Sequence, residues 1–78
     1  MSKKAHIPVI ERLLSGWTHP QGPDMAFNDA LAEWHSDKVF TGSIYEYMGL
    51  TWEEYRRWAG DAKAAAVILQ ERRSLRAQ

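Results

Sequence analysis

The sequence predicts an all-α protein, a compact bundle of four or five short helices with a helix-turn-helix-like central pair. No segment alternates apolar and polar residues with the period of two that a half-buried strand requires. Apolar residues instead recur at helical spacing in short segments separated by glycine, proline and capping residues. Four tryptophans, three tyrosines and two phenylalanines in 78 residues supply the large apolar side chains from which so small a core can form. We therefore expect residues 1–78 to form a single small helical domain.

The first predicted helix follows a polar, basic start over residues 1–5, which we expect to fray. Residues 7–15 fit a helix with Pro8 in its first turn and Gly16 just past its end. Its apolar stripe would consist of Ile7, Ile10, Leu13 and Leu14.

A loop and a longer helix come next. Residues 16–23 contain two prolines and two glycines, a composition that predicts a loop. Asp24 is a suitable N-cap for a helix over 25–36. One buried stripe of this helix would consist of Phe27, Ala30, Leu31 and Trp34.

The strongest local signals lie between residues 41 and 58. Ile44 and Met48 are four apart, as on the inward face of one short helix, and Gly49 then permits a positive φ. Thr51 and Glu54 have the spacing of a capping box at the start of a second helix. The staple positions beside this cap are those of Leu50 and Tyr55.

The final helix is predicted from residue 62 to about 75, after Ala59 and Gly60 close the preceding one and Asp61 caps the new start. Its arginines lie near its C-terminal end, where cations suit the helix dipole. Most of the core is expected to consist of Leu31, Trp34, Ile44, Met48, Leu50, Tyr55, Trp58, Ile68 and Leu69.

Charge is balanced overall but unevenly distributed. From residue 24 to residue 61 there are eight acidic and three basic residues, and the two ends carry the compensating basic excess. Such a distribution is typical of solvated helix faces, and it also fits a middle that meets a basic partner or ends that meet a polyanion. Glu53 and Arg57 are spaced for a favourable i, i+4 pair on an exposed face.

Signals for catalysis, a metal or a membrane are lacking in the sequence. There is no cysteine, and His6, His19 and His35 lie in three different segments without metal-ligand spacing. There is no glycine-rich phosphate loop and no nucleophile elbow. We expect no catalytic residue, no metal and no cofactor. The sequence shows no signal peptide and no apolar run of membrane-spanning length, which predicts a cytoplasmic protein without membrane contact.

Residues 44–58 also fit the register of helix-turn-helix DNA readers. Counting from Ile44, glycine lies five positions on, followed by Leu50 and Thr51, and Tyr55 lies at position eleven. The second helix would then meet DNA through Trp52, Glu53, Arg56 and Arg57. Two features argue against DNA. Tyr45 occupies a position that is usually small, and Glu46, Glu53 and Glu54 place negative charge where phosphates would approach.

Three stretches carry a resemblance, namely Trp34-His35, residues 43–58 and residues 68–73. They resemble a family of small, poorly characterised bacterial helical proteins with a Trp-His pair, a Glu-Tyr-Leu-Gly-Met-Thr-x-Glu-Glu-Tyr-x-x-Trp core and a closing Ile-x-x-x-Arg segment. Met48 and Leu50 exchange the usual Leu and Met of that core, which conserves volume. Because the family's genes often lie near mobile elements, the resemblance implies an accessory or regulatory role without catalysis.

Three functions follow as hypotheses. The first is a non-catalytic helical module that regulates or inhibits a macromolecular partner by protein-protein interaction, with Tyr47, Trp17, Trp52 and Arg56 as exposed contact candidates. Trp52 has a second interpretation as a member of the core stripe, and Trp17 has one as an anchor tucked under its loop, which we favour. The alternatives are a helix-turn-helix DNA-binding transcriptional regulator, which could be a homodimer, and a phage or mobile-element inhibitor of a host defence complex. That inhibitor would use the acidic face formed by Glu46, Glu53 and Glu54.

Overall fold

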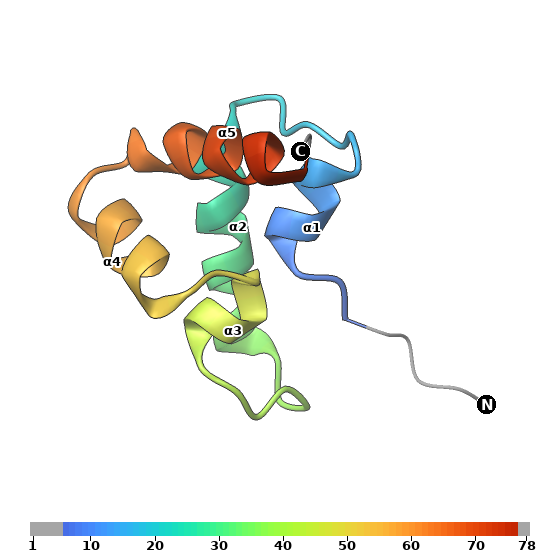
Figure 1. Ribbon diagram of the computed structural model, residues 1–78. Coiled ribbons are helices and arrows are strands. Elements are labelled where there is room, and N and C mark those ends of the chain that lie inside the picture. The colour runs from blue at the N-terminus through green and yellow to red at the C-terminus, as the bar shows by residue number, and fades with distance from the viewer. Residues whose placement is uncertain (1–5, 77–78) are drawn as a thin grey trace.

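The computed structural model describes residues 6–76, in which the chain forms five helices and no strand. Figure 1 shows them in chain order: α1 (Val9–Leu14), α2 (Pro23–Ser36), α3 (Ile44–Met48), α4 (Trp52–Gly60) and α5 (Ala64–Arg76). The predicted all-α bundle of short helices is therefore confirmed. The expected fraying of residues 1–5 lies outside the described residues.

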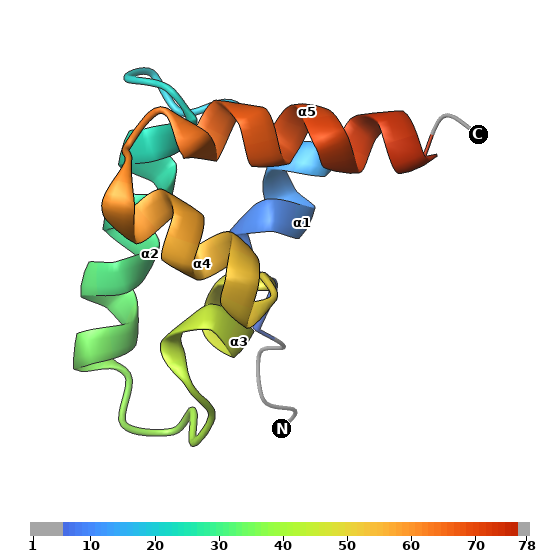
Figure 2. The same cartoon turned by 60° about the vertical axis from the view of Figure 1, so that its left-hand side comes forward.

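The longest helix, α2, is the element against which most others pack. It contacts α1, α3 and α5. In Figures 1 and 2, α5 crosses one end of α2, α3 lies toward the other end, and α4 spans the space between α3 and α5. The arrangement leaves one long side of α4 without a covering helix among the described residues.

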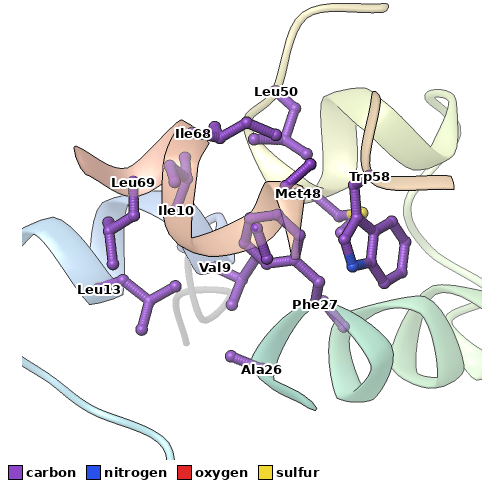
Figure 3. Packing of buried hydrophobic residues seen from close by; sticks show 13 residues of the cluster. Val9, Ile10, Leu13, Ala26, Phe27, Met48, Leu50, Trp58, Ile68 and Leu69 are labelled. Atoms are coloured by element: carbon purple, nitrogen blue, oxygen red, sulfur yellow. The ribbon is translucent and has the colours of Figure 1, made fainter. Parts of the chain in front are cut away.

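The core lies between α1, α2, α3 and α5 (Figure 3). The largest fully buried side chains are Ile10, Leu13, Phe27, Met48 and Ile68. Trp58 closes one side of the core, and its ring meets that of Phe27 edge-on with centroids 5.4 Å apart. Burial of these apolar side chains supplies most of the driving force for folding.

The predicted core is partly correct. Five of its members are buried, and the other four, Leu31, Trp34, Ile44 and Tyr55, are only partly buried at its margin. Trp34 instead donates its indole Nε1–H to the carbonyl of Gly42 at 3.2 Å. Conversely, α1 contributes more than expected, because Val9, Ile10 and Leu13 are all buried while Ile7 lies outside the helix and is exposed.

Two predicted helix starts differ from the structure. Asp24 does not cap α2, because the helix begins at Pro23 and the N-cap position belongs to Gly22, whose φ is +98°. Proline suits the first helical position, since its missing N–H would have no helical partner there. Asp61 is the C-cap of α4, and α5 begins only at Ala64. The Asp61 carboxylate accepts the backbone N–H of Lys63 at 3.0 Å in the turn between these helices.

The turn between α3 and α4 forms as predicted. Gly49 ends α3 with φ at +83°, and Thr51 and Glu54 form a complete capping box at the start of α4. A Cβ on Gly49 would lie 2.6 Å from Cγ2 of Ile10 and 2.7 Å from Cβ of Pro8, so glycine also permits close approach of α1. A second capping box, between Ser43 and Glu46, fixes the start of α3.

Candidate protein-interaction surface

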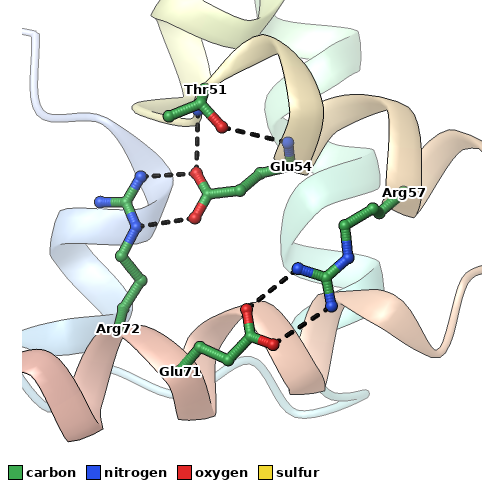
Figure 4. Close-up of polar contacts among 5 residues, drawn as sticks. All are labelled: Thr51, Glu54, Arg57, Glu71 and Arg72. Atoms are coloured by element: carbon green, nitrogen blue, oxygen red, sulfur yellow. Dashed lines mark hydrogen bonds and ion pairs between the residues drawn. The ribbon is translucent and has the colours of Figure 1, made fainter.

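Two pairs of charged side chains hold α4 against α5 (Figure 4). The Glu54 carboxylate accepts hydrogen bonds from Arg72 Nη2 at 2.6 Å and from Arg72 Nε at 2.9 Å. Arg72 Nη2 also donates to the carbonyl of Gly49 at 3.0 Å. One turn away, Arg57 donates twice to Glu71, at 3.0 and 3.3 Å. Bidentate pairs of this kind fix orientation as well as distance.

These contacts shift the ionisation of the groups they join. Hydrogen bonding from Arg72 lowers the pKa of Glu54, against the opposing effect of burial, and the Thr51 amide adds to the lowering. Glu54 raises the pKa of Arg72 in return. Glu71 has a lowered pKa because of Arg57. All four groups therefore stay charged at neutral pH, and both ion pairs connect α4 to α5.

The partner of Arg57 differs from the sequence expectation. Arg57 pairs with Glu71 of α5 rather than with Glu53 at i, i+4. The reason is that Arg57 faces α5, where it meets a carboxylate across two helices. Arg57 also counted among the DNA-binding candidates, and its donors to Glu71 are directed away from the outer side of α4.

A row of aromatic rings begins on α3 and runs along α4 to the core. The ring centroids of Tyr45 and Trp52 are 5.8 Å apart, those of Trp52 and Tyr55 are 6.2 Å apart, and those of Tyr55 and Trp58 are 6.0 Å apart. Trp58 is buried, whereas Trp52 remains 54% exposed. Trp52 is therefore a surface residue, and its alternative assignment to the core is wrong.

Arg56 lies on the same side of α4 and is exposed. It forms no ion pair with any other residue between 6 and 76. We call Tyr45, Trp52, Tyr55 and Arg56 the α4 surface. Glu53 is exposed beside it, so the sequence-predicted residues Trp52, Glu53 and Arg56 all remain accessible on this helix.

A groove between α2 and α4 continues this surface. Its volume is about 410 Å³, and it is open to solvent. Tyr55 lines it and thereby links it to the α4 surface. At its base, the Trp58 indole Nε1–H donates to Asp24 Oδ1 at 2.7 Å. The remaining lining residues are Asn28, Leu31, Ala59, Gly60, Asp61 and Ala62.

Tyr47 was expected to be exposed, and the structure contradicts this. Only 5% of Tyr47 is accessible, because His6 stacks on its ring at 3.9 Å and Phe40 meets it edge-on at 4.9 Å. Burial is also the main reason that the pKa of Tyr47 is raised. The loop after α2 brings Phe40 into place, as the Asp37 carboxylate accepts the backbone N–H groups of Val39 and Phe40 at 2.8 and 3.0 Å.

Trp17 is 37% exposed, which fits its interpretation as an exposed residue better than that as an anchor, but it belongs to a different surface. The Arg12 guanidinium lies 4.5 Å from its ring centroid, in a cation-π contact that ties the loop to α1. His19, in the same loop, accepts the N–H of Gln21 at Nδ1, so its Nε2 carries the proton donated to Asp29 at 2.8 Å. These contacts account for the loop conformation and leave Trp17 apart from the α4 surface.

Neither a metal cluster nor a transmembrane segment appears in the described part of the chain. Between residues 6 and 76, no three His, Cys, Asp or Glu side chains are grouped so that they could hold a metal ion. No helix in this range is long and apolar enough to cross a membrane. No protein family, curated protein or solved structure matches the chain.

Proposed function

We propose that this protein is a small non-catalytic helical module that regulates or inhibits a macromolecular partner through protein-protein contact at the α4 surface. The observation that carries the proposal is a half-exposed tryptophan on a helix that two ion pairs, one turn apart, hold on α5. Trp52 is the first residue of α4, next to a complete capping box, and the Glu54 and Arg57 ion pairs hold the helix on α5.

The composition of the α4 surface is that of an interface centre. Trp, Tyr and Arg are the residue types most enriched among interface residues that carry binding energy. A tryptophan can bury up to about 250 Å², so covering the exposed half of Trp52 is worth about 3 kcal/mol. Because the ion pairs to α5 already place α4, binding requires little further ordering of this helix, and the gain is set against the general entropy cost of association.

The charges around Trp52 favour protein over DNA as the partner. Arg56 and Glu53 cancel each other on the outer side of the helix, and Glu46 adds a further exposed negative charge. Arg57, which DNA would need, is engaged with Glu71. Binding to DNA draws much of its affinity from cations that meet phosphates, and this surface presents one.

An inhibitor that imitates nucleic acid with an acidic face has less support. The hypothesis needs Glu46, Glu53 and Glu54 on one exposed face. Glu54 instead points toward α5 and is neutralised by Arg72. The resemblance of residues 43–58 to bacterial proteins encoded near mobile elements supports an accessory role, which the proposed interaction module includes.

Affinity capture with a matched pair of variants tests the proposal. Tagged protein is used to capture partners from lysate with and without nuclease, together with Trp52→Ser and Val67→Ser. Val67 is an exposed apolar residue on α5, a different helix from the one that carries Trp52. We expect one nuclease-resistant protein to be retained by the parent and by Val67→Ser, and to be lost with Trp52→Ser. Equal retention by both variants, or loss on nuclease treatment, would contradict the proposal.

A further inference from the structure

We infer that the α2–α4 groove receives an arginine side chain of the protein partner. This inference rests on the proposed function and extends it, because it names the chemistry that the partner must present beside the contact with Trp52.

The first reason is the charge of the groove. Asp24 and Asp61 line it, and no lysine, arginine or histidine does. Neither carboxylate forms an ion pair within residues 6–76. All of their hydrogen-bond donors are neutral. Asp24 accepts from the Trp58 indole at 2.7 Å and from Asn28 Nδ2 at 3.4 Å, and Asp61 accepts from the backbone amide of Lys63 at 3.0 Å. The groove thus keeps two negative charges without a matching cation.

The second reason is that α4 ends in the groove. Its last residues, Ala59 and Gly60, line the cavity. Their carbonyls accept no hydrogen bond from the described residues, since the Lys63 amide bonds the Asp61 carboxylate and the Ala64 amide bonds the Asp61 carbonyl. The C-terminal end of a helix carries a partial negative charge, which adds to the field of the two carboxylates.

The third reason selects arginine over lysine. Tyr55 lines the groove and offers the face or edge of an aromatic ring beside the carboxylates. A guanidinium is planar, stacks on aromatic rings and has five donors, so it can satisfy carboxylate and carbonyl oxygens at once. An ammonium group is a compact, strongly hydrated charge that gains less from such a site. The open shape suits a side chain presented by another protein rather than an enclosed small molecule.

The inference is tested on the isolated protein by NMR titration with the peptide acetyl-Gly-Arg-Gly-amide. We expect the peptide to shift the Trp58 indole N–H resonance and the amides of residues 59–62. Asp24→Asn combined with Asp61→Asn should weaken this binding at least about tenfold, because two charge-assisted contacts are lost. Asparagine keeps an acceptor for the Trp58 indole and the Lys63 amide, so the fold is retained. Asp29→Asn with Glu33→Gln makes the same change in net charge outside the groove and should leave binding unchanged.

Several results would overturn the inference. These are equal shifts from peptides with citrulline or lysine in place of arginine, equal weakening by the control pair, or no effect of the groove variants. Should the double variant fail to fold, Asp61→Asn alone must still weaken binding several-fold. A partner lost with Trp52→Ser but retained by the groove variants would refute the inference while the proposed function stands. A peptide that binds the groove although no partner depends on Trp52 would refute the proposed function instead.

Discussion

Replacing Glu54 with glutamine should remove one charge from the contact between α4 and α5 while keeping the helix cap. Glutamine can still accept the Thr51 N–H, as it does in other capping boxes. Two opposite charges about 4 Å apart attract by about 4 kcal/mol at an effective dielectric constant of about 20. Desolvation offsets much of this, and the Glu54 and Arg72 side chains remain 16% and 23% exposed. We therefore expect Glu54→Gln to lower the free energy of unfolding by about 1–2 kcal/mol.

Urea denaturation followed by tryptophan fluorescence measures this loss, and a double-mutant cycle isolates the pair. Glu54→Gln, Arg72→Met and the double variant should give a coupling energy of about 1 kcal/mol or more. Arg57 and Glu71 provide the matched control, because their geometry is also bidentate while both side chains are about half exposed. The cycle with Arg57→Gln and Glu71→Gln should show a clearly smaller coupling, because solvent screens this pair more strongly.

The comparison of the two cycles shows whether burial and the third contact of Arg72 increase the coupling energy of an ion pair. Arg72 bridges Glu54 and the carbonyl of Gly49, so its loss should affect the turn before α4 as well as the helix contact. Equal coupling energies for the two pairs would refute this reasoning. A coupling of zero for Glu54 and Arg72 would also refute it, because the two side chains would then contribute no interaction energy to stability.

Three further predictions concern pH, the turn and the groove. The pKa of Glu54 is lowered in the folded protein, mainly by Arg72. The stabilisation from this ion pair is therefore present above the unfolded pKa of about 4.3 and is lost as pH falls through the folded value. When the free energy of unfolding is measured as a function of pH, it should fall less steeply in acid for Glu54→Gln than for the parent. Gly49→Ala should lower stability by about 2–4 kcal/mol through its positive φ and crowding, whereas Gly60→Ala, with open space at Cβ, should be neutral or slightly stabilising in thermal melts. Trp58→Phe should cost about 2 kcal/mol in urea unfolding, because the Asp24 carboxylate loses its indole donor.

Features fixed by neighbouring residues could be predicted from the sequence. The capping box of Thr51 and Glu54 and the positive φ of Gly49 depend on residues within a few positions of one another. The α-helical class follows in the same way from local spacing. The Ser43 and Glu46 capping box has the same signature as the predicted one, so the sequence contained a signal for it.

Features that depend on distant residues could not be predicted. Asp24 looks like an N-cap locally, and its role as acceptor for Trp58 requires a contact across 34 positions. Tyr47 is buried by His6 and Phe40, which come from outside its own helix. In a helix of five residues, periodicity cannot separate a buried side chain from an exposed one, because every face lies close to some other part of a small domain.

The charged residues of α4 show how tertiary packing assigns different roles to similar residues. Residues 53 and 54 are both glutamate, and residues 56 and 57 are both arginine. Glu54 and Arg57, three positions apart, lie on the side that faces α5, where they meet Arg72 and Glu71. Glu53 and Arg56 have the same spacing one position earlier and are exposed. A shift of one position along the helix thus separates Glu54 and Arg57, which connect α4 to α5, from Glu53 and Arg56, which a partner can reach. The ion pairs of Glu54 and Arg57 therefore help to orient the side of α4 that carries Arg56.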